Sequence, residues 1–91
     1  MKKRVEVFFG GAVQGVGFRF TAERTAQHFE VVGYVRNLPD GRVELVAEGE
    51  EAVLKNFLEA LRHSPMEPFI RKVDIRWSEA ENCFRNFGIA Y

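Results

Sequence analysis

RVEVFFGGAVQGVGFRFTAERTAQHF, residues 4–29, changes its hydrophobic period at a run of glycines. Before the glycines, Val5, Val7 and Phe9 alternate with other residues, which is typical of a strand with one buried face. From Phe18 onward, apolar residues recur at spacings of three and four, as they do along one face of a helix. The stretch therefore predicts a strand, a glycine-rich loop and a helix, in that order.

The rest of the chain predicts two strands, a second helix and two further strands. Strands over 31–37 and 42–48 are joined by Leu-Pro-Asp-Gly at 38–41, a set of residues that favours a hairpin turn. Gly49 is a permissible helix cap, and the following glutamates suit the positive end of a helix whose apolar stripe is Leu54, Phe57, Leu58 and Leu61. Strands are expected over 70–77 and 84–91. The order predicts an α+β fold, a ferredoxin-like split βαβ sandwich with a five-stranded, mostly antiparallel sheet and both helices on one face.

This topology places two distant segments at one edge of the sheet. In a βαβ unit the two strands run parallel, so their carboxyl ends lie on the same side. The glycine loop follows the first of these strands, and Asn37 ends the second. We therefore expect the loop and Asn37 to share one site.

Composition indicates a small globular protein. The 91 residues, 46% of them hydrophobic, suffice for one domain over 1–91. The 13 basic and 13 acidic residues give no net charge, which argues against nucleic-acid or membrane partners and favours a small molecule; a monomer is expected. Cys83 is the only cysteine, no cluster of cysteine and histidine has metal-ligand spacing, and Glu6 interrupts the short apolar run near the N-terminus. These features predict a cytoplasmic protein without a targeting segment, metal or cofactor.

The glycine loop suits an anion. A glycine-rich turn from a strand into a helix presents unpaired N–H groups and the positive end of the helix dipole. Arg19 in the first helical turn is disfavoured there by about 0.3–1 kcal/mol unless an anion is bound. A loop that serves only geometry and a solvated surface arginine remain the alternatives. The pattern is neither a Walker P-loop nor a complete dinucleotide fingerprint.

Two motifs make a family resemblance specific. Gly-Ala-Val-Gln-Gly-Val-Gly-Phe-Arg at 11–19 resembles the first signature of the acylphosphatases, and Gly-Tyr-Val-Arg-Asn at 33–37, with Gly41 and Val43, resembles the second. The similarity extends over essentially the whole chain. It implies that Arg19 binds a phosphoryl group and that Asn37 positions the attacking water. It also implies that the backbone amides of the loop form the phosphate cradle, from Gln14, Gly15, Val16, Gly17 and Phe18 to Arg19.

The resemblance implies hydrolysis of a carboxyl-phosphate anhydride by direct attack of water, without metal or cofactor. The leaving carboxylate needs no protonation, which agrees with motifs that contain no histidine or carboxylate. Asn37 alone could equally begin the turn before Pro39. The main functional alternative is a non-catalytic module that binds an acyl or carbamoyl phosphate. An RNA-binding module of related fold is disfavoured, because the aromatic-rich signature and net positive charge are absent.

The chain departs from the family pattern in two places, and its last residue raises a further expectation. Glu30 stands where the family often has glycine, which predicts backbone strain after the first helix and a higher melting temperature for Glu30→Gly. Ala12 replaces a common arginine of the first signature, which could shift substrate preference. The free carboxylate of Tyr91 is expected to approach Arg19 and help to orient it.

Overall fold

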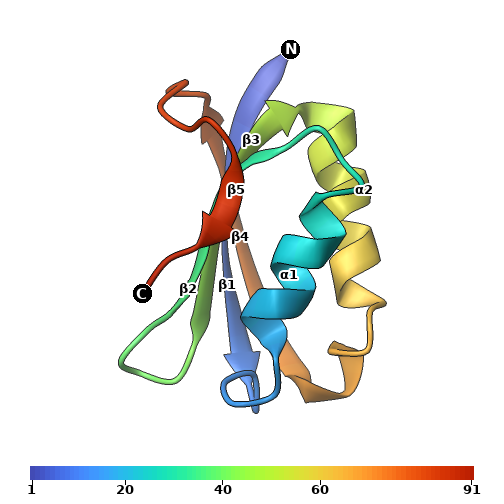
Figure 1. The fold of residues 1–91 in the computed structure, drawn as a ribbon, viewed down its shortest axis with the longest axis vertical. Helices are drawn as coiled ribbons and strands as arrows, with labels where there is room; N and C mark the ends of the chain where they lie inside the picture. Colours follow the sequence, from blue (N-terminus) through green and yellow to red (C-terminus); the bar gives the residue numbers. More distant parts are fainter.

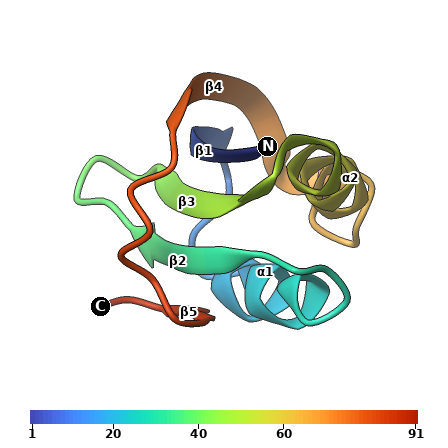
Figure 2. The ribbon, with the colours of Figure 1, turned by 90° about the horizontal axis from the view of Figure 1, so that it is seen from above.

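The computed structural model describes residues 1–91. The chain folds into a five-stranded sheet with two helices on one of its faces (Figures 1 and 2). Neither helix is long and apolar enough to cross a membrane. The elements in chain order are β1 (Lys2–Gly11), α1 (Phe18–Ala26), β2 (Val32–Asn37), β3 (Val43–Glu50), α2 (Glu51–Arg62), the short 3-10 helix η1 (Glu67–Phe69), β4 (Ile70–Glu79) and β5 (Phe87–Ile89).

The strand order in the sheet is β4-β1-β3-β2-β5. Strand β3 is antiparallel to both of its neighbours, β1 and β2, so β1 and β2 run parallel to each other with β3 between them. Strand β4 is antiparallel to β1, and only β5 pairs parallel, with β2. This is the split βαβ arrangement with one added strand, and the predicted fold class is confirmed.

The core lies between the sheet and the helices, and it follows the hydrophobic period of the sequence. Val5, Val7 and Phe9 of β1 have no exposed surface, and their partners on β3 are equally buried. The stripe of α1 covers this face with Phe18, Ala22 and Ala26. Burial of each large apolar side chain stabilises the fold by about 1.5–3 kcal/mol. Because α1 is held on the sheet by this burial, the direction in which the glycine loop leaves β1 is fixed.

The other face of the sheet is crossed by the segment between β4 and β5, as Figure 2 shows. The carboxylate of Glu48, 3% exposed, holds this segment by accepting hydrogen bonds from the backbone N–H groups of Glu81 and Asn82 and from Arg4 Nη1, each at 2.9 Å. Burial opposes ionisation of this carboxyl, but the hydrogen bonds that it accepts outweigh burial. The pKa of Glu48 therefore lies below its ordinary value.

We expect Glu48→Gln to lower the free energy of unfolding by about 2 kcal/mol at neutral pH, because hydrogen bonds to a charged group are lost. A carboxyl whose pKa is lower in the folded chain stabilises the fold fully above the unfolded pKa of about 4.3 and loses that effect as the pH falls through the folded pKa. The difference in the free energy of unfolding between wild type and variant, measured with urea, should therefore narrow as the pH falls through that range. Glu79→Gln, at an exposed ion pair with Lys3, is the control. A gap that is independent of pH would contradict this account.

Two boundary predictions at the helices were wrong. Gly49 lies within β3, opposite Lys3, and Glu50 is the residue that caps α2. The first helix ends at Ala26, so Glu30 lies in the following turn, and Asn82 is the single non-glycine residue with a positive φ. Glu30 therefore carries no left-handed strain, which removes the backbone reason for expecting a higher melting temperature from Glu30→Gly.

The last strand is shorter than the predicted range 84–91. Strand β5 covers only Phe87–Ile89, because Phe84 turns onto the other face of the sheet and packs against Tyr34 with 5.9 Å between ring centroids. The predicted strand thus joined Phe84 and Phe87, two aromatic residues that pack on different faces of the sheet.

Candidate active site

The carboxyl ends of β1 and β2 lie at the same end of the sheet (Figure 1), as the topology predicted. The glycine loop, residues 12–17, leaves β1 there and enters α1. Its partner is the turn that follows β2. The side-chain amide of Gln14 bridges the two segments, because Nε2 donates to the carbonyl oxygens of Leu38 at 2.8 Å and of Arg42 at 2.9 Å.

The backbone of the loop has the geometry of an anion cradle. Gly15 and Gly17 have φ angles of 79° and 83°, which only glycine adopts without strain, and they alternate with residues of negative φ. The N–H groups from Gln14 to Phe20 donate no hydrogen bond within the protein; the first helical bond runs from Thr21 N–H to the carbonyl of Gly17 at 3.0 Å. Such a run of unpaired N–H groups at a helix N-terminus binds anions.

Arg19 and Asn37 line one cavity beside this cradle. It has a volume of about 190 Å³. Both side chains are half-buried, and neither makes a hydrogen bond or an ion pair within the protein. The lining residues are Val13, Gly15, Gly17, Phe18, Arg19, Phe20 and Asn37. The structure thus brings both signature motifs to one cavity in which Arg19 is the one ionisable residue.

The electrostatic character of the cavity is positive. The first turn of α1 contains no acidic residue, so the charge of Arg19 adds to the positive end of the helix dipole without compensation. The ring of Tyr91 lies over the guanidinium, 5.1 Å from Cζ to the ring centroid. The sequence led us to expect the Tyr91 carboxylate here, but Arg19 forms no ion pair with it, and the contact is made by the ring.

Three of the predicted cradle residues use their side chains for contacts within the protein. Phe18 is 2% exposed, and its ring packs on Phe9 with 4.8 Å between centroids. Val16 packs against the hydrophobic core, and the side chain of Gln14 is committed to the turn. At these three positions the backbone N–H is the group left to meet a ligand.

Asn37 is not needed by the turn that it precedes. That turn is closed by the bonds from Leu38 N–H to the carbonyl of Arg42 at 2.8 Å and from Gly41 N–H to the carbonyl of Leu38 at 3.1 Å. The side chain that supports it belongs to Asp40, whose Oδ1 accepts from Arg42 N–H at 3.0 Å. The turn-forming alternative for Asn37 therefore has no support in the contacts, and its amide is available to the cavity.

We expect Gln14→Ala to cost about 2 kcal/mol of stability, the sum of two hydrogen bonds of about 1 kcal/mol each. Both acceptor carbonyls keep backbone partners, so no buried group is orphaned. Loosening of the loop should also weaken binding of inorganic phosphate several-fold. Urea unfolding and phosphate titration measure the two effects, with Gln27→Ala, an exposed glutamine, as the control. An unchanged unfolding midpoint would show that the bridge is not stabilising.

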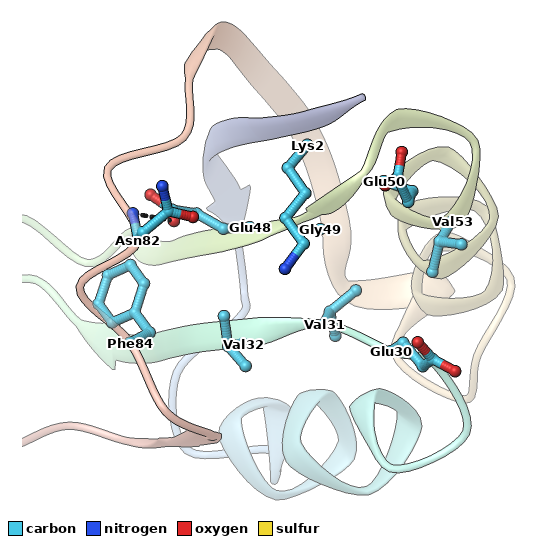
Figure 3. A pocket seen from close by; sticks show the side chains of 10 residues that line it. All are labelled: Lys2, Glu30, Val31, Val32, Glu48, Gly49, Glu50, Val53, Asn82 and Phe84. Carbon is cyan, nitrogen blue, oxygen red and sulfur yellow. Dashed lines mark hydrogen bonds between the residues drawn. The ribbon is translucent and has the colours of Figure 1, made fainter.

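A larger cavity of about 520 Å³ lies around the amino end of β1 (Figure 3). Lys2 extends into it, and the carboxylates of Glu30 and Glu50 point away from its interior. The buried acid in its lining, Glu48, accepts three hydrogen bonds within the protein. Nothing in this lining points to chemistry, so we assign the candidate site to the smaller cavity.

Neither histidine reaches the candidate site. His28 is exposed in the turn that follows α1, and His63 lies at the end of α2 between Glu59 and Glu67, 2.8 and 2.9 Å away. The contacts with Glu59 and then Glu67 raise the pKa of His63 above its ordinary value. The prediction that neither histidine acts as a general base agrees with these positions.

Sequence reasoning missed Phe20 as part of the cavity. This side chain is 65% exposed although it is aromatic, and it stands outside the buried stripe of α1. An apolar residue on the polar side of a helix, next to a candidate ligand-binding residue, was the available signal.

Comparison with known proteins identifies the family of the chain. A family model described as Acylphosphatase matches residues 5–89. A relative named acylphosphatase from Archaeoglobus fulgidus is 44% identical over 87 residues, 96% of this chain and 97% of its own, and one from Salinibacter ruber is 41% identical over 97% of this chain and 93% of its own. The crystal structure of acylphosphatase from Bacillus subtilis superimposes with a TM-score of 0.87 at 32% identity, covering 98% of this chain and 99% of that one. With both motifs on one cavity and this similarity along its length, the chain belongs to the acylphosphatase family.

Proposed function

We propose that this protein hydrolyses acyl phosphates to a carboxylate and inorganic phosphate. The observation that carries the proposal is the shared cavity, where an unpaired amide cradle, the uncompensated charge of Arg19 and the free amide of Asn37 meet. Membership of the family supports the same activity. We further propose that residues 1–91 act as one domain around their single hydrophobic core, and that the exposed free thiol of Cys83 reflects a reducing, cytoplasmic location.

In the proposed mechanism the loop amides and Arg19 hold the terminal phosphoryl group. The amides donate to its oxygens, and the planar guanidinium donates two parallel hydrogen bonds. Phosphoryl transfer passes through a loose, in-line transition state, so positioning and charge stabilisation supply most of the catalysis. Asn37 supplies the positioning of water, because its side-chain oxygen can accept from a water molecule beside the phosphorus.

The missing general acid agrees with an anhydride substrate. Water forms a bond to phosphorus as the bond to the acyl oxygen breaks, and the electron pair leaves with a carboxylate whose acid has a pKa of about 4. That group needs no proton at neutral pH, and the proton of the attacking water passes to a phosphoryl oxygen. The cavity lining offers no histidine or carboxylate that could protonate a more basic leaving group, which disfavours alkyl phosphomonoesters.

The test is hydrolysis of benzoyl phosphate by the wild-type protein, with and without a metal chelator. We expect turnover unaffected by chelator, inhibition by inorganic phosphate, and cleavage of phenyl phosphate slower by at least about 10³-fold, since phenol has a pKa of about 10. In water enriched in a heavy oxygen isotope, the label should enter phosphate rather than benzoate. Label in benzoate would place the attack at the carbonyl carbon and contradict the mechanism.

The same experiment separates the enzyme from the binding-module alternative. A module would bind inorganic phosphate or an acyl phosphate at this cavity and leave benzoyl phosphate to decay at its uncatalysed rate. Phosphate binding without turnover by the folded wild type would therefore establish that alternative.

A further inference from the structure

Phe20 is an exposed aromatic side chain at the mouth of the candidate site. It is the third residue of α1, and the buried positions of that helix are Phe18, Ala22 and Ala26. Its ring is 65% exposed, yet it lines the cavity that contains Arg19 and Asn37. A single exposed apolar residue is ordinary on a protein surface, so its position in this lining is what requires explanation.

Phe20 is the one large apolar side chain of the lining that a ligand can reach. Val13 has no exposed surface and Phe18 is 2% exposed, so both belong to the core beneath the loop. The other members are glycines and the two polar residues already assigned to phosphate and water. Any apolar contact between this cavity and a substrate therefore falls to Phe20.

The cavity is too small to enclose a whole acyl phosphate, so the phosphoryl group and the acyl group lie in different places. Its volume of about 190 Å³ lies below the roughly 300–1,000 Å³ of pockets that enclose a whole ligand. The phosphoryl group occupies the cradle, and in-line attack directs the acyl group away from the water held at Asn37. The acyl group thus extends out of the cavity toward solvent, and Phe20 is the lining side chain that is both apolar and exposed there.

We propose that Phe20 is a specificity residue, whose ring contacts the acyl part of the substrate and selects aromatic or bulky apolar acyl phosphates over acetyl phosphate. The inference rests on the proposed function and adds the class of acyl group to it. An aromatic ring packs on the face or edge of Phe20 and removes apolar surface of both from water, whereas a methyl group covers little of it.

The test compares benzoyl phosphate with acetyl phosphate in wild type, Phe20→Ala and Phe20→Leu. We expect the ratio of their kcat/KM values to favour benzoyl phosphate in wild type and to fall about tenfold in Phe20→Ala, mainly through KM, with Phe20→Leu between them. Trp77→Ala removes another exposed aromatic, one that lines a cavity with Lys3 and Lys55, and should keep the wild-type ratio. A ratio unchanged in Phe20→Ala would overturn the proposal, as would an equal loss for both substrates.

Binding of phenylphosphonate and methylphosphonate gives a readout that does not require turnover. Both carry a phosphoryl group on carbon and differ only in the organic part. Calorimetry should show that wild type prefers phenylphosphonate and that Phe20→Ala loses this preference, while equal preferences in the two proteins would again overturn the proposal. Absence of hydrolysis by wild type, with this discrimination present, would refute the proposed function but leave the contact with Phe20 established.

Discussion

Arg19→Ala is expected to lower kcat/KM for benzoyl phosphate by about 10³-fold or more, the scale on which arginines act in phosphoryl transfer. The guanidinium is the one charged group of the cavity, and its attraction grows as charge spreads over the phosphoryl oxygens in the transition state. Binding of inorganic phosphate should weaken in parallel, because product carries the same oxygens. Arg19→Lys keeps the charge but not the planar pair of donors, so its rate should lie between those of wild type and Arg19→Ala.

Stability should respond quite differently from activity in this variant. Removal of a cation from the N-terminal turn of α1 relieves about 0.5 kcal/mol of unfavourable dipole interaction, and loss of the contact with the Tyr91 ring costs about as much. Urea unfolding should therefore give a midpoint close to that of wild type. Arg24→Ala, at an exposed arginine in the last turn of the same helix, is the control and should keep full activity. A folded Arg19→Ala protein with near wild-type turnover would remove Arg19 from the mechanism.

The sequence predicted the fold well where one face of each element is buried. Val5, Val7 and Phe9 alternate because β1 has the helices on one side, and all three are fully buried. The element order then left few topologies, since parallel strands joined by a helix must cross over in one hand. The strand order and the register were not predicted from the sequence, and the structure supplies both.

Boundaries were the weakest part of the prediction, and each error has a physical cause. Glycine is permissible both as a helix cap and in a strand, so Gly49 could not be assigned from its type alone. The run 84–91 contains two phenylalanines separated by Arg85 and Asn86. Their rings, Phe84 and Phe87, pack on opposite sides of the sheet, against Tyr34 and Phe57. Periodicity does not distinguish these two environments in a short segment.

The sequence predicted the residues of the candidate site and that the loop and Asn37 share it, but not the contacts that hold the loop and the turn together. The motifs indicated Arg19, Asn37 and the amides, and the cavity unites them. The bridge made by Gln14 ends on main-chain carbonyls, which have no sequence signature, so its acceptors at Leu38 and Arg42 could not be foreseen. The ring of Tyr91 over Arg19 is likewise a consequence of where the chain passes after β5.

Asn37→Ala is expected to lower kcat for benzoyl phosphate by about 10²–10³-fold, the cost of losing one preorganised hydrogen-bonding group in a catalytic site. The expected kinetic effect differs from that of Arg19→Ala, because in the proposed mechanism Asn37 holds the water and not the phosphoryl group. Affinity for inorganic phosphate should therefore stay close to that of wild type while turnover falls. Steady-state kinetics together with phosphate inhibition separate the two roles.

The structure also predicts that Asn37→Ala leaves the fold intact. The side chain makes no hydrogen bond within the protein, and the backbone pairing of Asn37 with Val43 does not depend on it, so the free energy of unfolding should change by no more than about 0.5 kcal/mol. Asn37→Asp keeps the shape but places a negative charge beside the phosphoryl oxygens, and it should raise KM as well as lower kcat. Asn86→Ala, an exposed asparagine before β5, is the control. If Asn37→Ala instead weakened phosphate binding and turnover equally, the amide would be a ligand of the phosphoryl group, and the water would need another partner.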